Sequence, residues 1–199
     1  MSEAVVGALV RQLDRAFERI RPKVEGLTDR EYLWEPVPGC WTVHRRRPED
    51  RFWEPGVEVF VNGGGEWVAD YAGADLDPPP FTTIAWRMNH VASIAWVWTD
   101  HVLGNGGPQW DDHDVPHTAD AAVAWWDEGC RGFRDAAAAL RDEGLKRRYR
   151  APWGDERAVE GWIEVFLDEQ VHHMAEVGVL RDLYRETGGA PVGSARPNA

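Results

Sequence analysis

Apolar residues recur along the chain at the three- and four-residue spacing of amphipathic helices. In the N-terminal segment, Val6, Leu13 and Phe17 fall on one stripe, and charged residues occupy the other faces. A later segment, TTIAWRMNHVASIAWVWTDHVL, is apolar nearly all round, which is typical of a helix buried on several sides. The pattern predicts four helices, over about residues 3–21, 82–103, 118–143 and 155–185.

Helix-breaking residues agree with several of these bounds. Pro22 is expected to help end the first helix. Gly104 follows the second predicted helix and Gly188 the fourth, and glycine tolerates the left-handed conformation in which many helices end. The chain beyond Gly188 is rich in Gly, Pro and Ser, so we expect a single domain over residues 1–187 and a flexible tail over residues 188–199.

A stretch of about 60 residues, rich in Trp, Pro and Gly, separates the first two predicted helices. Within it, VEVFVNGGGEWVADY alternates around Asn62-Gly63, which predicts a small β-hairpin. The basic run over residues 44–47 is short and precedes acidic residues, so we interpret it as a solvated loop. These features predict an all-α protein, a four-helix bundle with a long crossover between its first two helices that carries the hairpin.

Composition and charge narrow the classes of function. The net charge of −12, with 34 acidic against 22 basic side chains, argues against a nucleic-acid partner, which needs a basic surface. The chain lacks the run of about 18 apolar residues that a membrane span requires. Its N-terminus has no signal-peptide pattern, and two cysteines make no disulfide framework. We therefore expect a cytoplasmic protein with neither nucleic acid nor membrane as a partner.

The fourth predicted helix carries a carboxylate and an imidazole on its apolar stripe. Glu169 and His173 are four residues apart, so they lie on one helical face. His90 interrupts the apolar second helix and could complete a metal site of two imidazoles and a carboxylate, with positions left for water or substrate. The alternative is a hydrogen-bonded polar cluster without metal. His172 lies about 100° around the helix from His173 and could replace it as the ligand.

Four further side chains have a structural and a functional interpretation. Trp41 either anchors the long connection by packing or lines a pocket, and Arg87 either binds an anionic group or pairs with a neighbouring carboxylate. Cys40 follows a turn without an evident activating partner, so we interpret it as a small structural residue rather than a nucleophile. Cys130 lies on the stripe of the third predicted helix and is expected in the core.

Three stretches of the chain resemble a known family. They are LTDREYLWEPVPGCW (27–41), TIAWRMNHVA (83–92) and DEQVHHMAEVGVLRDLY (168–184). In content and order they resemble the DinB-like superfamily of four-helix-bundle proteins, which includes the YfiT-like proteins and the amino-terminal domain of mycothiol-dependent maleylpyruvate isomerase. The resemblance covers about residues 5–187, nearly the whole chain.

The resemblance implies a divalent metal, Zn, Ni, Mn or Fe, held by one histidine of the second helix and two residues four apart on the fourth. In this sequence these residues are His90, Glu169 and His173, the last of which opens the turn HMAE at the place of the family's HRGQ-like turn. The family usually has histidine at the position of Glu169. A carboxylate there still binds metal but lowers the Lewis acidity of the ion.

The activity implied by the resemblance is transfer or isomerisation of a small electrophile with a low-molecular-weight thiol such as mycothiol. His172 would serve as a base or would support a ligand, and Arg87 and Trp41 would contact the bound molecules. The alternatives are a metal-dependent hydrolase on the same site, and a non-catalytic small-molecule-binding or stress-associated bundle with a vestigial metal site. A homodimer is expected by family analogy alone.

Overall fold

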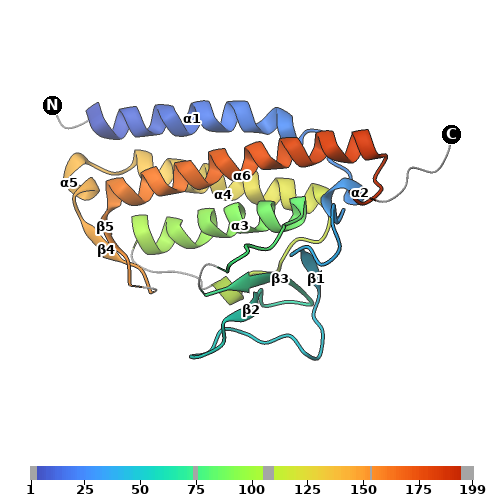
Figure 1. Ribbon diagram of the computed structural model, residues 1–199. Coiled ribbons are helices and arrows are strands. Elements are labelled where there is room, and N and C mark those ends of the chain that lie inside the picture. The colour runs from blue at the N-terminus through green and yellow to red at the C-terminus, as the bar shows by residue number, and fades with distance from the viewer. Residues whose placement is uncertain (1–3, 74–75, 105–109, 153, 194–199) are drawn as a thin grey trace.

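The computed structural model describes residues 4–73, 76–104, 110–152 and 154–193 of the protein. Its helices span Ala4–Val24 (α1), Asp29–Tyr32 (α2), Ile84–Trp98 (α3), Ala119–Ala138 (α4), Asp142–Leu145 (α5) and Val159–Thr187 (α6). The four long helices, α1, α3, α4 and α6, lie side by side (Figure 1). Helix α1 packs against α4 and α6, and α3 packs against the same two helices, so all four surround one core.

Local interactions explain where α3 begins and α6 ends. The side chain of Thr83 accepts a hydrogen bond from the Trp86 N–H at the start of α3, which satisfies one of the free donors of the first turn. Helix α6 ends at Gly188, whose φ of 63° places it in the left-handed region. Both ends therefore agree with the residue types in the sequence.

The prediction that Pro22 ends the first helix is wrong, because α1 includes Pro22 and runs to Val24. Proline in a helix removes one backbone N–H, and here it does so in the last turn, where little helix follows. The chain leaves the helix at Gly26, which has a φ of 65°. A left-handed glycine, rather than the proline, marks this end.

Other predicted bounds are also shifted. Helix α3 passes at its end into a π-helical turn over Thr99–Leu103, and the third predicted helix is divided into α4 and the short α5. Helix α6 begins later than residue 155, because Arg148–Arg150 (β4) and Glu156–Ala158 (β5) form an antiparallel pair just before it. The sequence analysis did not predict this second hairpin.

A three-stranded antiparallel sheet occupies the connection between α1 and α3. It consists of Val43–Arg45 (β1), Val59–Asn62 (β2) and Trp67–Ala72 (β3), in the order β1-β3-β2. The pair β2–β3 confirms the hairpin predicted around Asn62-Gly63. The interpretation of residues 44–47 as a solvated loop is wrong for His44, which is buried in β1 with its Nε2 3.2 Å from Asp70 Oδ1.

Hydrogen bonds attach this sheet to the first turns of α3. The indole N–H of Trp86 donates to the Asp70 carbonyl oxygen over 2.6 Å, and the Thr83 hydroxyl donates to the Thr42 hydroxyl over 3.0 Å. The Asp70 carboxylate accepts the Thr42 N–H over 2.9 Å. Strand β3 is thereby held beside the helix that carries His90.

The turn between β2 and β3 packs closely against residues 111–115 of the connection between α3 and α4. The Gly64 N–H donates to the His113 carbonyl over 2.9 Å. A β-carbon at Gly64 would lie 2.2 Å from the Asp111 carbonyl oxygen. No side chain can be added at Gly64 unless one of these two backbone segments moves.

Substitution of Gly64 with alanine is therefore expected to lower the free energy of unfolding by about 1–3 kcal/mol, the usual cost of overpacking. Urea unfolding followed by circular dichroism measures this change. Gly132→Ala is the matched control, because it lies on the exposed face of α4 and an added β-carbon there would meet no atom within 4 Å. The control should be stabilised, since alanine is the better helix former. Equal stability of the two variants would contradict the packing argument.

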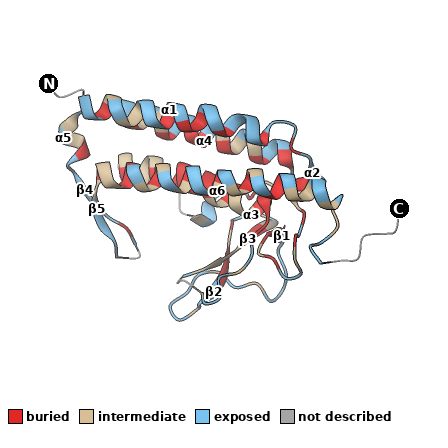
Figure 2. Ribbon diagram, turned by 45° about the horizontal axis from the view of Figure 1, so that its top comes forward, coloured by how far each residue is buried: buried red, intermediate tan, exposed pale blue. Residues whose placement is uncertain are grey.

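Each long helix carries buried residues along its length (Figure 2), and most of the buried residues are apolar. Trp126, Phe133 and Phe166 are among the largest fully buried side chains. Gln170 is also fully buried, and its amide satisfies both of its polar atoms: Oε1 accepts the Trp126 indole N–H and Nε2 donates to the Val91 carbonyl, each over 2.9 Å. The core thus contains a hydrogen-bonded link between α3, α4 and α6.

A buried ion pair joins α2 to α6. The guanidinium of Arg181 lies 3.2 Å from Glu31 Oε1, and it donates to the carbonyl oxygens of Lys23 and Glu25 over 2.7 and 2.9 Å. The other carboxylate oxygen of Glu31 accepts hydrogen bonds from the backbone N–H and hydroxyl of Thr28. One arginine therefore fixes the end of α1 and the start of α2 against α6.

None of the helices in the described ranges is long and apolar enough to cross a bilayer. Residues 194–199, half of the segment expected to be a flexible tail, lie outside the described residues. Just before them, the Val192 N–H donates to the Pro36 carbonyl over 2.7 Å, so the beginning of that segment contacts the chain near α2.

Candidate metal centre

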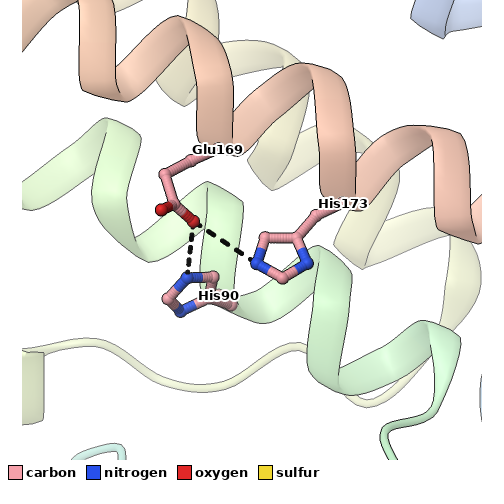
Figure 3. Close-up of side chains that lie close together, drawn as sticks. All are labelled: His90, Glu169 and His173. Atoms are coloured by element: carbon pink, nitrogen blue, oxygen red, sulfur yellow. Dashed lines mark hydrogen bonds and ion pairs between the residues drawn. The ribbon is translucent and has the colours of Figure 1, made fainter. Parts of the chain in front are cut away.

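Three side chains named by the sequence analysis meet between α3 and α6 (Figure 3). His90 comes from α3, and Glu169 and His173 come from α6. The Nε2 atoms of both histidines approach the same carboxylate oxygen, Glu169 Oε2, at 3.2 Å from His90 and 3.3 Å from His173. One ligand atom from each residue lies within 4.8 Å of the other two.

The buried amide of Gln170 explains why the two helices place these side chains together. Gln170 lies in sequence directly after Glu169, and its hydrogen bond to the Val91 carbonyl reaches the residue after His90. The bond therefore fixes the register of α6 against α3 at the level of the three side chains. The spacing of four residues then turns Glu169 and His173 to the same side.

The distances suit a small divalent cation. Zinc bonds of about 2.0–2.1 Å in tetrahedral geometry space the ligand atoms by about 3.3 Å. The two nitrogen-to-oxygen distances, 3.2 and 3.3 Å, match this spacing. Two imidazole nitrogens and one carboxylate oxygen also form a donor set that catalytic zinc and related metals use. The residues present therefore fit the metal that the resemblance implies.

The charges of the cluster favour a cation at neutral pH. Burial raises the pKa of Glu169, but hydrogen bonds from His173 and His90 outweigh burial and hold this pKa well below its usual range. Burial lowers the pKa of His173 to about 4, although the hydrogen bond to Glu169 opposes that change. The carboxylate is thus ionised and the His173 imidazole is neutral, which are the protonation states that bind metals.

His172 lies beside His173, with ring centroids 3.9 Å apart, but does not belong to this set of three. It is exposed, and its Nδ1 atom is 3.2 Å from the carbonyl oxygen of Asp168, one turn earlier on α6. It could bind an ion in a second group with His173 and Glu176. That group includes the exposed His172, whereas all three residues of the first group are partly buried. The structure thus brings His173, rather than His172, together with His90 and Glu169.

A pocket of about 490 Å³ opens beside the three-residue cluster. Aromatic side chains form part of its wall, namely Trp41 from the segment before β1, Tyr71 from β3 and Trp86 from α3. Arg87, His173 and Glu176 supply polar groups. Burial, with a further contribution from the charge of Glu169, raises the pKa of Tyr71 to about 12, so its hydroxyl stays protonated and able to donate a hydrogen bond.

Arg87 and Trp41 both line this pocket, in the place where the sequence analysis sought contacts to a cofactor or substrate. Arg87 also pairs with Glu176, which was the more conservative of its two interpretations. Burial lowers the pKa of Arg87, but guanidinium stays charged at neutral pH. The pair keeps both groups at the polar side of the pocket.

Comparison with known proteins identifies the family and the fold. A sequence profile of the DinB superfamily matches residues 12–177. The chain belongs to the DinB superfamily. The crystal structure of a DinB-like protein from Bacillus cereus ATCC 10987 has a similar fold, with a TM-score of 0.58 and 14% sequence identity over 96% of this chain and 95% of that one. No curated protein matches the sequence significantly.

The two cysteines of this DinB-superfamily protein are not placed to act as nucleophiles. Both are buried, and burial raises the pKa of each thiol. The Cys40 thiol donates to the Val37 carbonyl, and Cys130 lies beside Gln170 in the core. Neither residue lines the pocket. Both therefore agree with the structural interpretation.

Glu176 and Tyr71 are among the side chains of the candidate site that the sequence did not point to. Glu176 was visible in the HMAE turn three residues after His173, but its contact with Arg87 depends on how α3 and α6 pack. Tyr71 was visible in the predicted hairpin, but local alternation cannot tell which helix the sheet covers. Both contributions depend on tertiary packing rather than on a local pattern.

Proposed function

We propose that this protein is a metal-dependent enzyme that holds a divalent cation with His90, Glu169 and His173. The observation that carries the proposal is the convergence of two imidazole nitrogens on one ionised carboxylate beside a pocket large enough for a small molecule. In its specific form the proposal is a transferase or isomerase that uses a low-molecular-weight thiol, such as mycothiol, on a small electrophile.

A divalent cation bound there would lower the pKa of a thiol or water that binds it. The residues of this chain supply the surroundings for that chemistry. Trp41, Tyr71 and Trp86 give apolar surface that excludes water, and the Tyr71 hydroxyl can donate a hydrogen bond to a bound molecule. The guanidinium of Arg87 attracts anionic groups to the same pocket.

The buried cysteines support the use of an external thiol. Because Cys40 and Cys130 are buried, protonated at neutral pH and absent from the pocket wall, thiol chemistry at this site needs a thiol from solution. A pocket of about 490 Å³ has room for such a molecule or part of it together with a small electrophile. His172, which is exposed, is proposed as a base, and it would be a ligand only if the ion were bound in the second group with His173 and Glu176.

We extend the proposal to the organisation of the chain. The pairwise packing of α1, α3, α4 and α6 supports a four-helix bundle, and the core that they share supports one domain over residues 1–187. The homodimer and the cytoplasmic location stay predictions.

Elemental analysis of protein purified without a histidine tag tests the metal. We expect about one equivalent of Zn, Ni, Mn or Fe per chain, since three ligands form one site. The loaded and the chelator-treated protein are then given mycothiol and monochlorobimane, and the transfer forms a carbon–sulfur bond as chloride leaves. We expect the metal-loaded protein to catalyse this transfer and the chelator-treated protein to be inactive.

Two other outcomes select the alternatives. If the protein hydrolysed 4-nitrophenyl acetate only with metal and a thiol had no effect, the proposed function would change from a transferase to a hydrolase. If the protein bound no metal even after reconstitution, the enzyme proposal would fail. Glu169 and the two histidines would then be a polar cluster in a non-catalytic binding protein.

A further inference from the structure

The two histidines of the centre are held in different ways. The buried Nδ1 atom of His90 has no hydrogen-bond partner among the residues that the structure describes. The ring of His90 instead stacks on Trp86, with centroids 5.0 Å apart and planes 11° from parallel. The Nδ1 atom of His173 lies 3.0 Å from Glu176 Oε2. Among the described residues, a hydrogen bond at Nδ1 is therefore available to His173 and not to His90.

The position of that proton decides whether His173 can bind a cation. A neutral imidazole has one N–H and one lone pair, and the ring binds metal through the nitrogen with the lone pair. The Nε2 atom of His173 is the one that faces Glu169 and the centre. The hydrogen bond from His173 to Glu169 uses a proton on Nε2, and a cation can bind Nε2 only when that proton is on Nδ1 instead. The Glu176 carboxylate is placed to accept it there.

The position of Arg87 makes it more important that Glu176 is present to accept the Nδ1 proton of His173. One guanidinium nitrogen, Nη1, contacts Glu176 Oε2 and lies 3.4 Å from His173 Nδ1. A guanidinium can only donate hydrogen bonds. Without the carboxylate of Glu176, this N–H would face Nδ1 and favour the tautomer with the lone pair there. The proton would then be on Nε2, where it prevents metal binding.

We propose that Glu176 is a positioning residue that accepts the Nδ1 proton of His173 and so keeps Nε2 free for the metal. Arg87 holds Glu176 in place from α3, where its side chain is 13% exposed. Because the Glu176 side chain is 44% exposed, its charge is screened by solvent, and its effect depends on the hydrogen bond. The inference rests on the proposed function, since it concerns a ligand of the proposed metal centre.

Zinc affinity tests this role, measured by competition with a chromophoric chelator on the full-length protein. Glu176→Ala should bind zinc about 10–100-fold more weakly than the wild type, the usual cost of losing the partner of a metal-binding histidine. Glu176→Gln should retain most of the affinity, because its amide oxygen still accepts the Nδ1 proton. Glu164→Ala, which removes an exposed carboxylate from the same helix, should bind as the wild type does.

The outcomes separate this inference from the proposed function. If the wild type binds zinc and Glu176→Ala binds it equally well, the positioning role is excluded and the metal centre stands. If Glu176→Gln binds as weakly as Glu176→Ala, the negative charge rather than the hydrogen bond is responsible, and the inference is again wrong. Failure of the wild type to bind any metal overturns both. Far-ultraviolet circular dichroism of each variant shows whether it has folded.

Discussion

Replacement of His90 with alanine is expected to weaken zinc binding by more than about 100-fold, beyond the usual cost of losing a residue that only supports a ligand. His90 is the one member of the proposed set on α3, and its Nε2 atom lies 3.2 Å from Glu169 Oε2. Without it, only Glu169 and His173 of the proposed set remain, and two ligands hold an ion weakly. Isothermal titration with zinc measures the change, and circular dichroism should show that the helices remain.

Two further variants make this prediction specific. His172→Ala is the matched control, since it removes an exposed imidazole next in sequence to His173 and should leave zinc binding unchanged. Glu169→His should preserve binding, because it restores the residue type that the family usually has at that position. If His172→Ala lost the metal while His90→Ala kept it, the ion would belong to the second group, formed by His172, His173 and Glu176.

The largest loss of stability is expected from Arg181→Ala, which should lower the free energy of unfolding by about 3–5 kcal/mol. The side chains of Arg181 and Glu31 are each only 7% exposed, so removal of the arginine leaves a buried carboxylate without its cation. It also leaves the carbonyl oxygens of Lys23 and Glu25 without these donors. The change in the free energy of unfolding is obtained from the midpoint and slope of the urea unfolding curve.

A matched substitution lies one turn further along α6. Arg185→Ala breaks an ion pair whose side chains are 57% and 77% exposed, so it should cost no more than about 1 kcal/mol. Arg181→Met combined with Glu31→Gln should recover part of the loss, because no charge is then buried unpaired. A single Arg181→Ala variant as stable as Arg185→Ala would show that water reaches the pair and supports the remaining carboxylate.

The sequence was sufficient to predict the existence of the long helices and the pairing of Glu169 with His173, because both follow from local spacing. Four residues between Glu169 and His173 place them on one face of any helix, and a histidine within the apolar α3 segment must find a polar partner. The hairpin was predicted because Asn62-Gly63 suits a tight turn between alternating strands. These inferences need no knowledge of how distant segments pack.

Several of the contacts that the sequence did not reveal join segments far apart in the chain. Arg87 meets Glu176 only because α3 and α6 pack in a particular register, and Tyr71 reaches the pocket only because β3 is attached to α3. The burial of His44 has the same cause, since its partner Asp70 is on a neighbouring strand. The helix containing Pro22 was misjudged because a proline costs little in the last turn.

The buried amide of Gln170 has a consequence for how such a protein can change over time. Its bonds to Val91 and Trp126 hold α6 in register without any contribution from Glu169 or His173. Mutations at those two positions of the proposed centre are therefore expected to alter which ion is preferred while the helices stay aligned. Selection could then act on metal preference and on folding as nearly separate traits.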